Sequence, residues 1–509
     1  MDKQPVELSS QVSEPPSEER RTGGEREGAG RSRRQFLTGA AAAAGMLALP
    51  AMVRAFEHSG GIDQDDWTHN TDCDRGFFLG QVVQQLKDGR VMVIGGLDEN
   101  GNYGGDRNRF YHPHTDTWSV APSLPSDKII CFILGWALLK NGKLLIGGGD
   151  VVNGFDNPGD NGKCYLFDPK TNSWAATGAI PETIWGNAPW NPMVLLDDGN
   201  VLFIGARDST YEGTSGGPNH DGYQSAIRKS YLYDTSAGTW SATGLMAIAH
   251  EAGFYFPLPG NKAIVIGGYL KFAPGPAAGN FSSFSNTSEI YSGGSFSGST
   301  VLPPVTRMDN MGEDDIVSAE LKGARVRAGA VATEKYIVLV GGQYGSAVDS
   351  DGSQLFYRSS IIVYNIHANS WAVSGVAMPY TVTESLCFAL DDDNILIAGG
   401  ENMDIGLPTP KTFIFCISKA TLTPSTDMPT VFRNWESSIG SGPVGLLPYN
   451  YPDENQQGAI ALQNGSFLSV CGLDTTSFNG TPGGHGDTLT PDKKRGKPRW
   501  GEHEIDHRR

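Results

Sequence analysis

Carboxylate side chains recur just after glycine pairs in this 509-residue sequence, where they could bind a cation or a polyhydroxylated ligand. They are Asp98, Asp150, Asp208, Glu401 and Asp474. If these side chains converge, they form a collar of oxygen ligands of the kind that calcium prefers. Aspartate also favours such turns because it hydrogen-bonds to its own backbone, so a purely local role stays open.

A second set of charged and aromatic residues lies in long loops or in the segments that lead into apolar strands. These are Trp185, His220, His250, Glu251, Arg325 and Arg327, with Arg75 and Glu384 at related positions. Mixed charge beside an aromatic ring suits the recognition of sugars or peptides. The two sets, without Arg75 and Glu384, are the predicted ligand-binding residues.

Acid–base catalysis would need a histidine or carboxylate placed within reach of the proton that it transfers. His250 and Glu251 are adjacent, but the sequence offers no decisive acid/base pair, so no catalytic residue is assigned. His112 and His114 fall in a polar turn and are predicted to be surface residues. These observations favour a binding module over an enzyme.

The elements that must position these residues are repeated hairpins. Segments such as "LKDGRVMVIGG" (86–96) and "LKNGKLLIGGG" (139–149) join a two-residue turn to an apolar strand that ends at a glycine pair. Because glycine has no side chain, it allows another backbone segment to approach closely and it adopts positive φ readily. The glycines are Gly95-Gly96, Gly147-Gly148, Gly205, Gly267-Gly268, Gly341-Gly342 and Gly399-Gly400, with Cys471-Gly472 as a degenerate seventh copy.

A nine-residue pattern follows four of these hairpins. "FYHPHTDTW" (110–118), "LFDPKTNSW" (166–174), "LYDTSAGTW" (232–240) and "VYNIHANSW" (363–371) each place a Trp seven residues after an aromatic. Phe415 and Leu422 keep the spacing, whereas Tyr291 is followed by Gly298. We expect Trp118, Trp174, Trp240 and Trp371 to be structural wedges between repeats.

The hairpin copies and the aromatic–Trp copies together resemble the kelch-repeat family over nearly all of residues 62–480. The resemblance implies an all-β, seven-bladed propeller of four-stranded antiparallel blades, with six blades as the alternative. Trp67 has no glycine pair before it, so a strand at about 64–70 is expected to close the last blade. Arg327-Ala328-Gly329 also matches an ordinary kelch blade start.

Kelch propellers include galactose-oxidase-like copper enzymes and sialic-acid mutarotases, so a carbohydrate-active enzyme is the alternative function. The copper site of the first family needs a Tyr-His pair, a Tyr bonded to a Cys, and a His from a C-terminal domain. Tyr111-His112 lies in a turn, and only a short polar segment follows residue 480. The resemblance therefore extends to the fold, and no cofactor is predicted; calcium or copper is possible but unsupported.

The N-terminal region resembles a twin-arginine export signal. Arg33, Arg34, Phe36 and Leu37 precede an alanine-rich run that is too short to span a bilayer comfortably. The predicted domains are a disordered leader (1–30), the signal peptide (31–55), the propeller (56–480) and a polar disordered tail (481–509). We expect a periplasmic or extracellular protein without stable membrane insertion after cleavage. Six cysteines leave disulfide pairing open.

The charge of the body limits its partners. The whole chain has a net charge of −17. Because residues 1–55 and 481–509 carry net charges of +1 and +2, the net charge of residues 56–480 is −20. Such a body repels nucleic acid. Insertions at 207–229, 269–288, 305–324 and 343–360 should gather on one face of the propeller. The sequence thus predicts an exported, monomeric module that binds a carbohydrate or protein ligand through this long-loop face.

Overall fold

The computed structural model contains strands and no helix among the residues that it describes. The chain divides into two compact units, Met1–Gly61 and Ile62–Arg509, and every described residue belongs to the second. The described residues are 66–71, 73, 81–95, 108–125, 130–151, 162–181, 184–185, 193–205, 207–208, 224–225, 228–250, 253–272, 281–303, 323–345, 355–428, 432–433, 459–463, 466–474 and 481–490. Within these ranges, no helix has the length and apolar character needed to cross a membrane.

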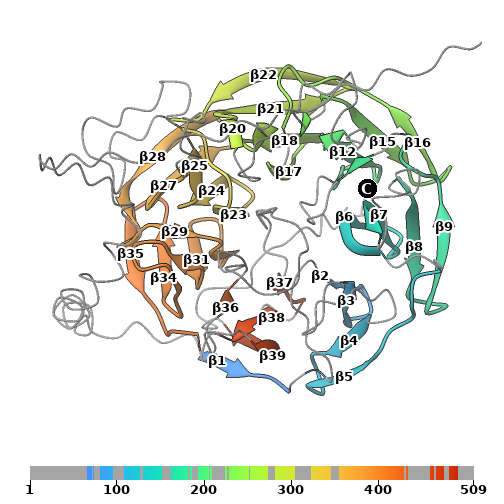
Figure 1. The fold of residues 1–509 in the computed structure, drawn as a ribbon, viewed down its shortest axis with the longest axis horizontal. Coiled ribbons are helices and arrows are strands. Elements are labelled where there is room, and N and C mark those ends of the chain that lie inside the picture. Colours follow the sequence, from blue (N-terminus) through green and yellow to red (C-terminus); the bar gives the residue numbers. More distant parts are fainter. Residues whose placement is uncertain are drawn as a thin grey trace, which may run out of the picture. The chain divides into compact units, whose positions relative to one another are not determined.

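Six sheets of the second unit share one construction, in which four antiparallel strands follow one another outward from a common centre (Figure 1). Blade 1 comprises β2 (Gln81–Gln85), β3 (Val91–Gly95), β4 (Arg109–His112) and β5 (Thr117–Val120). Blade 2 comprises β6 (Ile130–Leu138), β7 (Leu144–Val151), β8 (Cys164–Asp168) and β9 (Ser173–Thr177). Blade 3 comprises β11 (Met193–Leu195), β12 (Val201–Ile204), β15 (Ser230–Asp234) and β16 (Thr239–Ala242).

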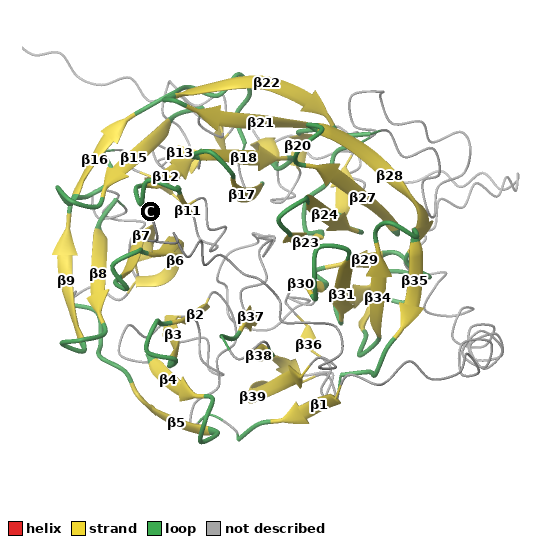
Figure 2. Ribbon diagram, turned by 180° about the vertical axis from the view of Figure 1, so that it is seen from behind, coloured by secondary structure: helices red, strands yellow, loops and turns green. Residues whose placement is uncertain are grey.

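The remaining three sheets repeat this order. Blade 4 comprises β17 (Phe254–Leu258), β18 (Lys262–Ile266), β21 (Thr287–Ser292) and β22 (Ser295–Val301). Blade 5 comprises β23 (Gly329–Ala332), β24 (Tyr336–Val340), β27 (Ser360–Asn365) and β28 (Ser370–Ala377). Blade 6 comprises β30 (Leu386–Ala389), β31 (Asn394–Ala398), β34 (Thr412–Cys416) and β35 (Thr421–Pro424). The molecule is therefore an all-β propeller of four-stranded antiparallel blades, seen from behind in Figure 2.

The nine-residue pattern is a cross-strand pair between the two outer strands of a blade. Tyr111 lies opposite Trp118, and their ring centroids are 5.0 Å apart. The Trp ring also reaches the neighbouring repeat, since Trp174 Nε1 donates to the carbonyl of Pro122 at 3.1 Å. Aromatic pairs at this separation stabilise a sheet beyond the area that they bury. The predicted role of these tryptophans as wedges between blades fits these contacts.

Blade 4 has an aromatic pair that the sequence pattern did not reveal. Its outer strands are joined by the two-residue turn Gly293-Gly294, in which both glycines have positive φ (58° and 83°). This turn is shorter than those of the other blades, so Phe296 lies opposite Tyr291, with ring centroids 5.3 Å apart. Gly298, two residues further on, is not the equivalent of Trp.

A five-stranded sheet packs between blades 6 and 1. It contains β1 (Asp66–His69), β39 (Thr481–Thr490), β38 (Phe467–Asp474), β37 (Ala459–Ala461) and β36 (Phe432–Arg433). Phe467 stacks on Phe388 of blade 6, at 4.4 Å between centroids, and Leu468 packs into the core of blade 1. The structure thus contains six four-stranded blades, which is the alternative count, and not seven.

Two strands share one edge of β38, which explains the different count. β37 pairs with Phe467–Ser469, and β36 pairs with Leu473 and Asp474 further along the same strand. The predicted polar tail also begins later than expected, because residues 481–490 form β39 between β38 and β1. A strand of mostly small and polar residues is favoured here because both of its edges are hydrogen-bonded. Residues 491–509 lie outside the described residues.

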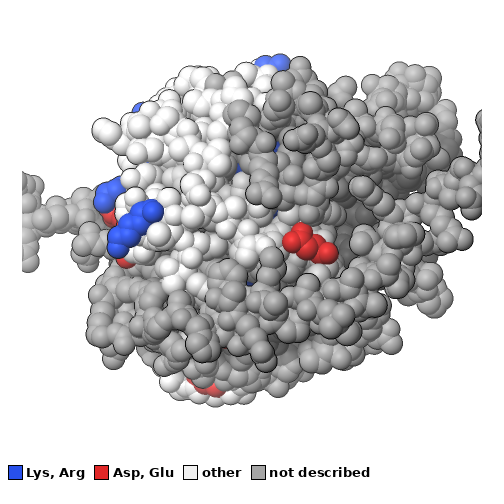
Figure 3. Space-filling model, turned by 90° about the vertical axis from the view of Figure 1, so that its left-hand side faces the viewer, with Lys and Arg blue, Asp and Glu red and all other residues white. Residues whose placement is uncertain are grey.

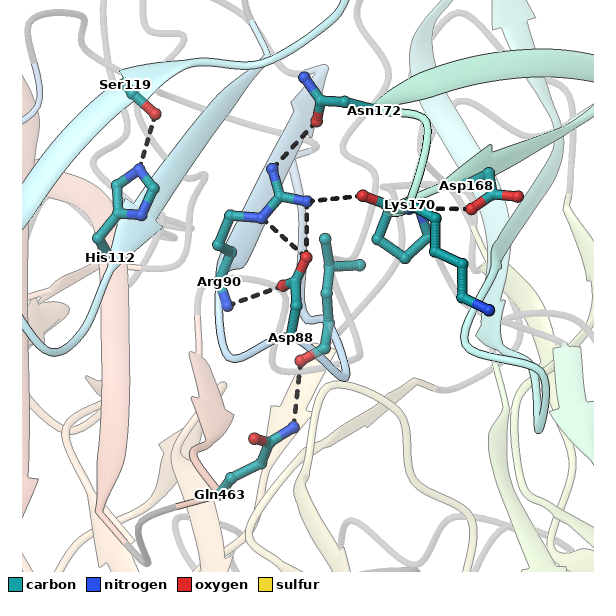
Figure 4. A network of polar contacts seen from close by, with 10 residues as sticks. Asp88, Arg90, His112, Ser119, Asp168, Lys170, Asn172 and Gln463 are labelled. Carbon is teal, nitrogen blue, oxygen red and sulfur yellow. Dashed lines mark hydrogen bonds and ion pairs between the residues drawn. The ribbon is translucent and has the colours of Figure 1, made fainter.

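Neighbouring blades bury their apolar faces against each other and link their short turns. The core between blades 1 and 2 includes Met92 and Phe110 of blade 1 and Leu144 of blade 2. The short turns lie at one end of the strands, which we call the plain end. There, Arg90 pairs with Asp88 at 2.6 Å and donates to Asn172 Oδ1 of blade 2 at 3.0 Å (Figure 4).

His112 and His114, which were predicted to be surface residues, lie at the plain end. His112 bonds to Ser119 Oγ at 2.7 Å within blade 1 and is half-buried, and His114 is exposed (Figure 4). The prediction that both are surface residues is thus confirmed for His114, while His112 is partly covered.

Candidate functional site

The segments that lead into the blades meet the loops that follow the glycine pairs, at the end opposite the short turns, which we call the loop end. β10 (Ile184–Trp185) pairs with β13 (Arg207–Asp208), and β29 (Val382–Thr383) pairs with β32 (Glu401–Asn402). In blade 5, Val326 and Gln343 form an isolated bridge. The expectation that the insertions gather on one face is confirmed for their described parts at 207–208, 224–225, 269–272 and 343–345. The loops are more regular than expected, because short strands build a second tier of small sheets there.

Three of these small sheets extend the tier. β32 continues into β33 (Leu407–Pro408) as a short hairpin. β25 (Gln343–Gly345) pairs with β26 (Leu355–Tyr357). β14 (Gln224–Ser225) pairs with β19 (Tyr269–Phe272), which pairs with β20 (Phe281–Phe284). Because β14 belongs to the loop of blade 3 and β19 to that of blade 4, this tier also connects neighbouring blades.

The glycine pairs let the lead-in segment of one blade pass directly over the strand end of the previous blade. In three consecutive interfaces, the first glycine faces a carbonyl oxygen of the next lead-in segment. The pairs are Gly205–His250, Gly267–Arg325 and Gly341–Val382, in which an added Cβ would lie 2.3, 2.8 and 2.2 Å from that oxygen. A side chain at these glycines would therefore separate the blades.

His250 and Arg325 occupy equivalent positions in successive lead-in segments. His250 Nδ1 donates to the carbonyl of Gly267 at 2.6 Å, and Arg325 Nη1 donates to the carbonyl of Gly341 at 3.1 Å. Both side chains are completely buried. Each residue therefore connects the preceding blade, through its backbone, to its own blade, through its side chain.

Glu289 is the partner of His250, and it belongs to none of the sequence motifs. Its Oε1 lies 3.4 Å from His250 Nε2, and its two oxygens accept the N–H groups of Ala247 and Ile248 at 2.7 and 2.8 Å. Burial raises the pKa of Glu289, but His250 and the two N–H donors outweigh burial, so the pKa lies below its ordinary value. The one sequence feature that could have indicated Glu289 is its position as a charged residue inside the strand "TSEIYS".

Arg327, Glu384 and Gln343 form a polar cluster between blades 5 and 6, which we call the blade 5–6 bridge. Arg327 Nε donates to Glu384 Oε1 at 2.5 Å, and Arg327 Nη1 donates to Gln343 Oε1 at 3.3 Å. The backbone N–H of Glu384 donates to the carbonyl of Arg327 at 2.9 Å. Only 12% of the Arg327 side chain and 1% of the Glu384 side chain are exposed.

The backbone of the blade 5–6 bridge is strained at both charged residues. Arg327 has φ 54° and Glu384 has φ 58°, in the left-handed region that residues with a Cβ seldom adopt. Such conformations cost about 1–3 kcal/mol each and collect at functional sites. Glu401 lies opposite Thr383, the residue before Glu384, and is buried. The sequence indicated Arg327 and Glu401, but it could not show that Arg327 pairs with Glu384 across two blades.

The other predicted site residues are spread around the loop end. Asp150 lies on β7 opposite Phe132, Trp185 on β10 opposite Arg207, Asp208 on β13 opposite Ile184, and Asp474 on β38 opposite Phe432. Asp98, His220 and Glu251 lie outside the described residues, as do Gly96 and the signal residues Arg33, Arg34, Phe36 and Leu37. The structure brings Trp185 and Asp208 to one small sheet, and a carboxylate collar stays a prediction.

Metal-ligating and nucleophilic groups are sparse in the ranges that the structure describes. Within them, no group of three His, Cys, Asp or Glu side chains is placed to hold a metal ion. Cys164, Cys387 and Cys416 are free thiols. Burial raises the pKa of Cys164 to about 12, which keeps this thiol protonated. On the side drawn in Figure 3, the described basic and acidic side chains form small separate groups and no continuous basic patch.

Comparison with known proteins relates this architecture to solved propellers. No protein-family model and no curated protein matches the sequence. One similar structure is a "novel fungal alcohol oxidase with catalytic diversity among the AA5 family, in complex with copper", with 13% identity, coverage of 86% of this chain and 79% of that chain, and a TM-score of 0.52. Another is YjhT, with 14% identity, coverage of 70% and 99%, and a TM-score of 0.46.

These identities are too low to transfer residues or activities. The likeness to the fungal oxidase covers most of both chains and shows the fold alone. Together with the strand order, it identifies this chain as a β-propeller of four-stranded antiparallel blades.

Proposed function

We propose that this chain is an exported propeller of kelch type that binds a carbohydrate through its loop end. The blade 5–6 bridge is the observation that carries the proposal. It holds an arginine, a glutamate and a glutamine in fixed contact on strained backbone, within the tier of small sheets. Sugar hydroxyl groups both donate and accept hydrogen bonds, so the partly exposed Arg327 guanidinium, held by the buried Glu384 and Gln343, suits them as a donor.

The positions of the other predicted residues also support the loop end as the ligand-binding end of the molecule. Trp185 and Asp208 belong to one two-stranded sheet of this tier, and Glu401 is on another. Tryptophan and carboxylate residues are suited to binding sugars and also peptides. A protein ligand is therefore the competing outcome of the experiment below.

Export by the twin-arginine route is part of the proposal. The pattern Arg33-Arg34-Gln35-Phe36-Leu37 and the alanine-rich run after it support it, with the mature chain starting near Phe56. Replacing both arginines by lysine should leave the precursor inside the cell with its leader attached. Immunoblotting of cell fractions measures this, and export of the double-lysine variant at the normal level would contradict the signal.

We also propose that the five-stranded sheet closes the ring between blades 6 and 1, although it is not a regular four-stranded blade. Four of its strands pair successively in the order β37, β38, β39 and β1, as the four strands of each regular blade do. Gln463 joins this sheet to blade 1, since its N–H donates to Gln85 Oε1 at 2.7 Å and its Nε2 to the carbonyl of Leu86 at 3.1 Å.

A glycan array tests the binding function. We expect the exported protein to bind a defined subset of neutral or acidic oligosaccharides and Arg327→Met to lose at least ten-fold in affinity, about 1.4 kcal/mol. Arg90→Met is the matched control, because it removes an arginine–carboxylate pair from the plain end. Circular dichroism must show that all three proteins are folded.

Three other results would redirect the proposal. Equal loss in Arg90→Met would mean that the effect of Arg327→Met is not local. Absence of glycan binding together with capture of a specific protein would replace the carbohydrate by a protein ligand. Turnover of a bound sugar, with or without added copper, would make the enzyme alternative primary.

A further inference from the structure

Arg325 is a completely buried cation whose charge is not balanced by a described side chain. Its Nη1 donates to the carbonyls of Gly341 and Ser360 at 3.1 and 3.2 Å, and its Nη2 donates to Ser360 Oγ at 3.2 Å. Its Nε has no hydrogen-bond partner among the described residues. Within those residues, no carboxylate forms an ion pair with Arg325.

A second buried arginine lies next to it. Arg358 is 1% exposed, its Nε donates to the carbonyl of Ala324 at 3.2 Å, and its guanidinium carbon lies 4.0 Å from the centre of the Tyr344 ring. Ala324 directly precedes Arg325, and the charge of Arg358 acts on Arg325, so the two arginines lie close to each other at the loop end of blade 5.

The charge of Arg325 favours a negative charge beside its guanidinium group. Burial, and then the charge of Arg358, lower the pKa of Arg325 well below its ordinary value. An arginine side chain nevertheless stays protonated in proteins. An uncompensated buried charge costs several kcal/mol, and carbonyl dipoles offset only part of that cost.

We propose that Arg325, next to Arg358, holds a small monovalent inorganic anion, of the size and charge of chloride, with Arg325 Nε as a donor. Both side chains are sealed from solvent, so a bare ion fits this region better than the carboxylate of a sugar or protein ligand. The site is separate from the blade 5–6 bridge, and it does not depend on the proposed binding function. The bound ion would lock the lead-in segment of blade 5 against blade 4, because the backbone of Arg325 lies on Gly267.

Thermal unfolding in matched salts tests this site on the full chain purified after export. The protein is dialysed into sodium gluconate, and chloride or bromide replaces gluconate at constant ionic strength. We expect a saturable rise in Tm of roughly 3 °C with either halide. Arg325→Met should abolish the halide dependence. The matched control Arg109→Met, which removes another buried arginine in blade 1, should retain it.

Anomalous diffraction from wild-type crystals grown in bromide gives a second readout that does not require the variant to fold. A bromide peak beside Arg325 Nε, together with the halide-dependent Tm, would establish the site. Identical Tm values in gluconate and chloride, halide stabilisation that survives Arg325→Met, or bromide crystals without a peak at this position would each overturn it.

Discussion

At the residue scale, Glu289 is the acidic side chain on which the lead-in segment of blade 4 depends. It accepts two backbone N–H groups and lies 3.4 Å from His250 Nε2, with 2% of its side chain exposed. Its folded-state pKa lies below the ordinary value of 4.5. Its contribution to stability is therefore fully present above about pH 4.5 and is lost as the pH falls through the lower, folded pKa.

We predict that Glu289→Gln lowers the free energy of unfolding by about 2 kcal/mol at pH 7, because one acceptor oxygen and the charge are lost. The difference from wild type should shrink as the pH drops below 4.5, where the wild-type carboxylate takes up its proton. Urea unfolding at pH 7 and pH 3.5 measures both values. The exposed Glu334→Gln is the control, and a difference that is the same at both pH values would contradict this account.

The sequence indicated where such charged residues occur, but not which of them meet. His250, Arg325 and Arg327 were all expected to face a ligand. The structure buries His250 and Arg325 completely, because their lead-in segments are pressed against the preceding blade. Partners such as Glu289 lie about 40 residues away and carry no local signal, so only the fold pairs them.

At the element scale, the glycine pairs decide how closely blades approach. We predict that Gly341→Ala lowers the free energy of unfolding by about 3 kcal/mol or more, because its Cβ would lie 2.2 Å from the carbonyl of Val382 and φ is 63°. Gly89→Ala should cost only about 1 kcal/mol. Gly89 also has positive φ (91°), but nothing lies within 4 Å of an added Cβ.

Urea unfolding of the two alanine variants separates backbone strain from blade separation. Equal destabilisation would mean that the close approach between blades 5 and 6 contributes nothing. The hairpin pattern predicted the inner two strands of the blades well, because turn chemistry and apolar runs are local. The pattern failed for Phe296 because the two-residue turn of blade 4 shifts the pairing register of the outer strands.

At the scale of the whole molecule, the pairing of β1 with β39 joins the start of the propeller to its end. We predict that a chain starting at Asn70 unfolds at a Tm at least 5 °C lower than a chain starting at Ile62, and that it associates through the uncovered edge of β39. Differential scanning calorimetry and light scattering measure the two effects. If both chains are equally stable monomers, β1 does not close the ring.

The sequence by itself determined the parts of this protein that depend on short-range chemistry: the all-β class, the hairpin turns and the outer aromatic pairs. These follow from turn geometry and alternation over fewer than about 15 residues. Tertiary structure alone decided the blade count, the strand at 481–490 and the buried partners of the charged residues. Those features depend on contacts between segments tens to hundreds of residues apart, and residue types at single positions do not encode such distances.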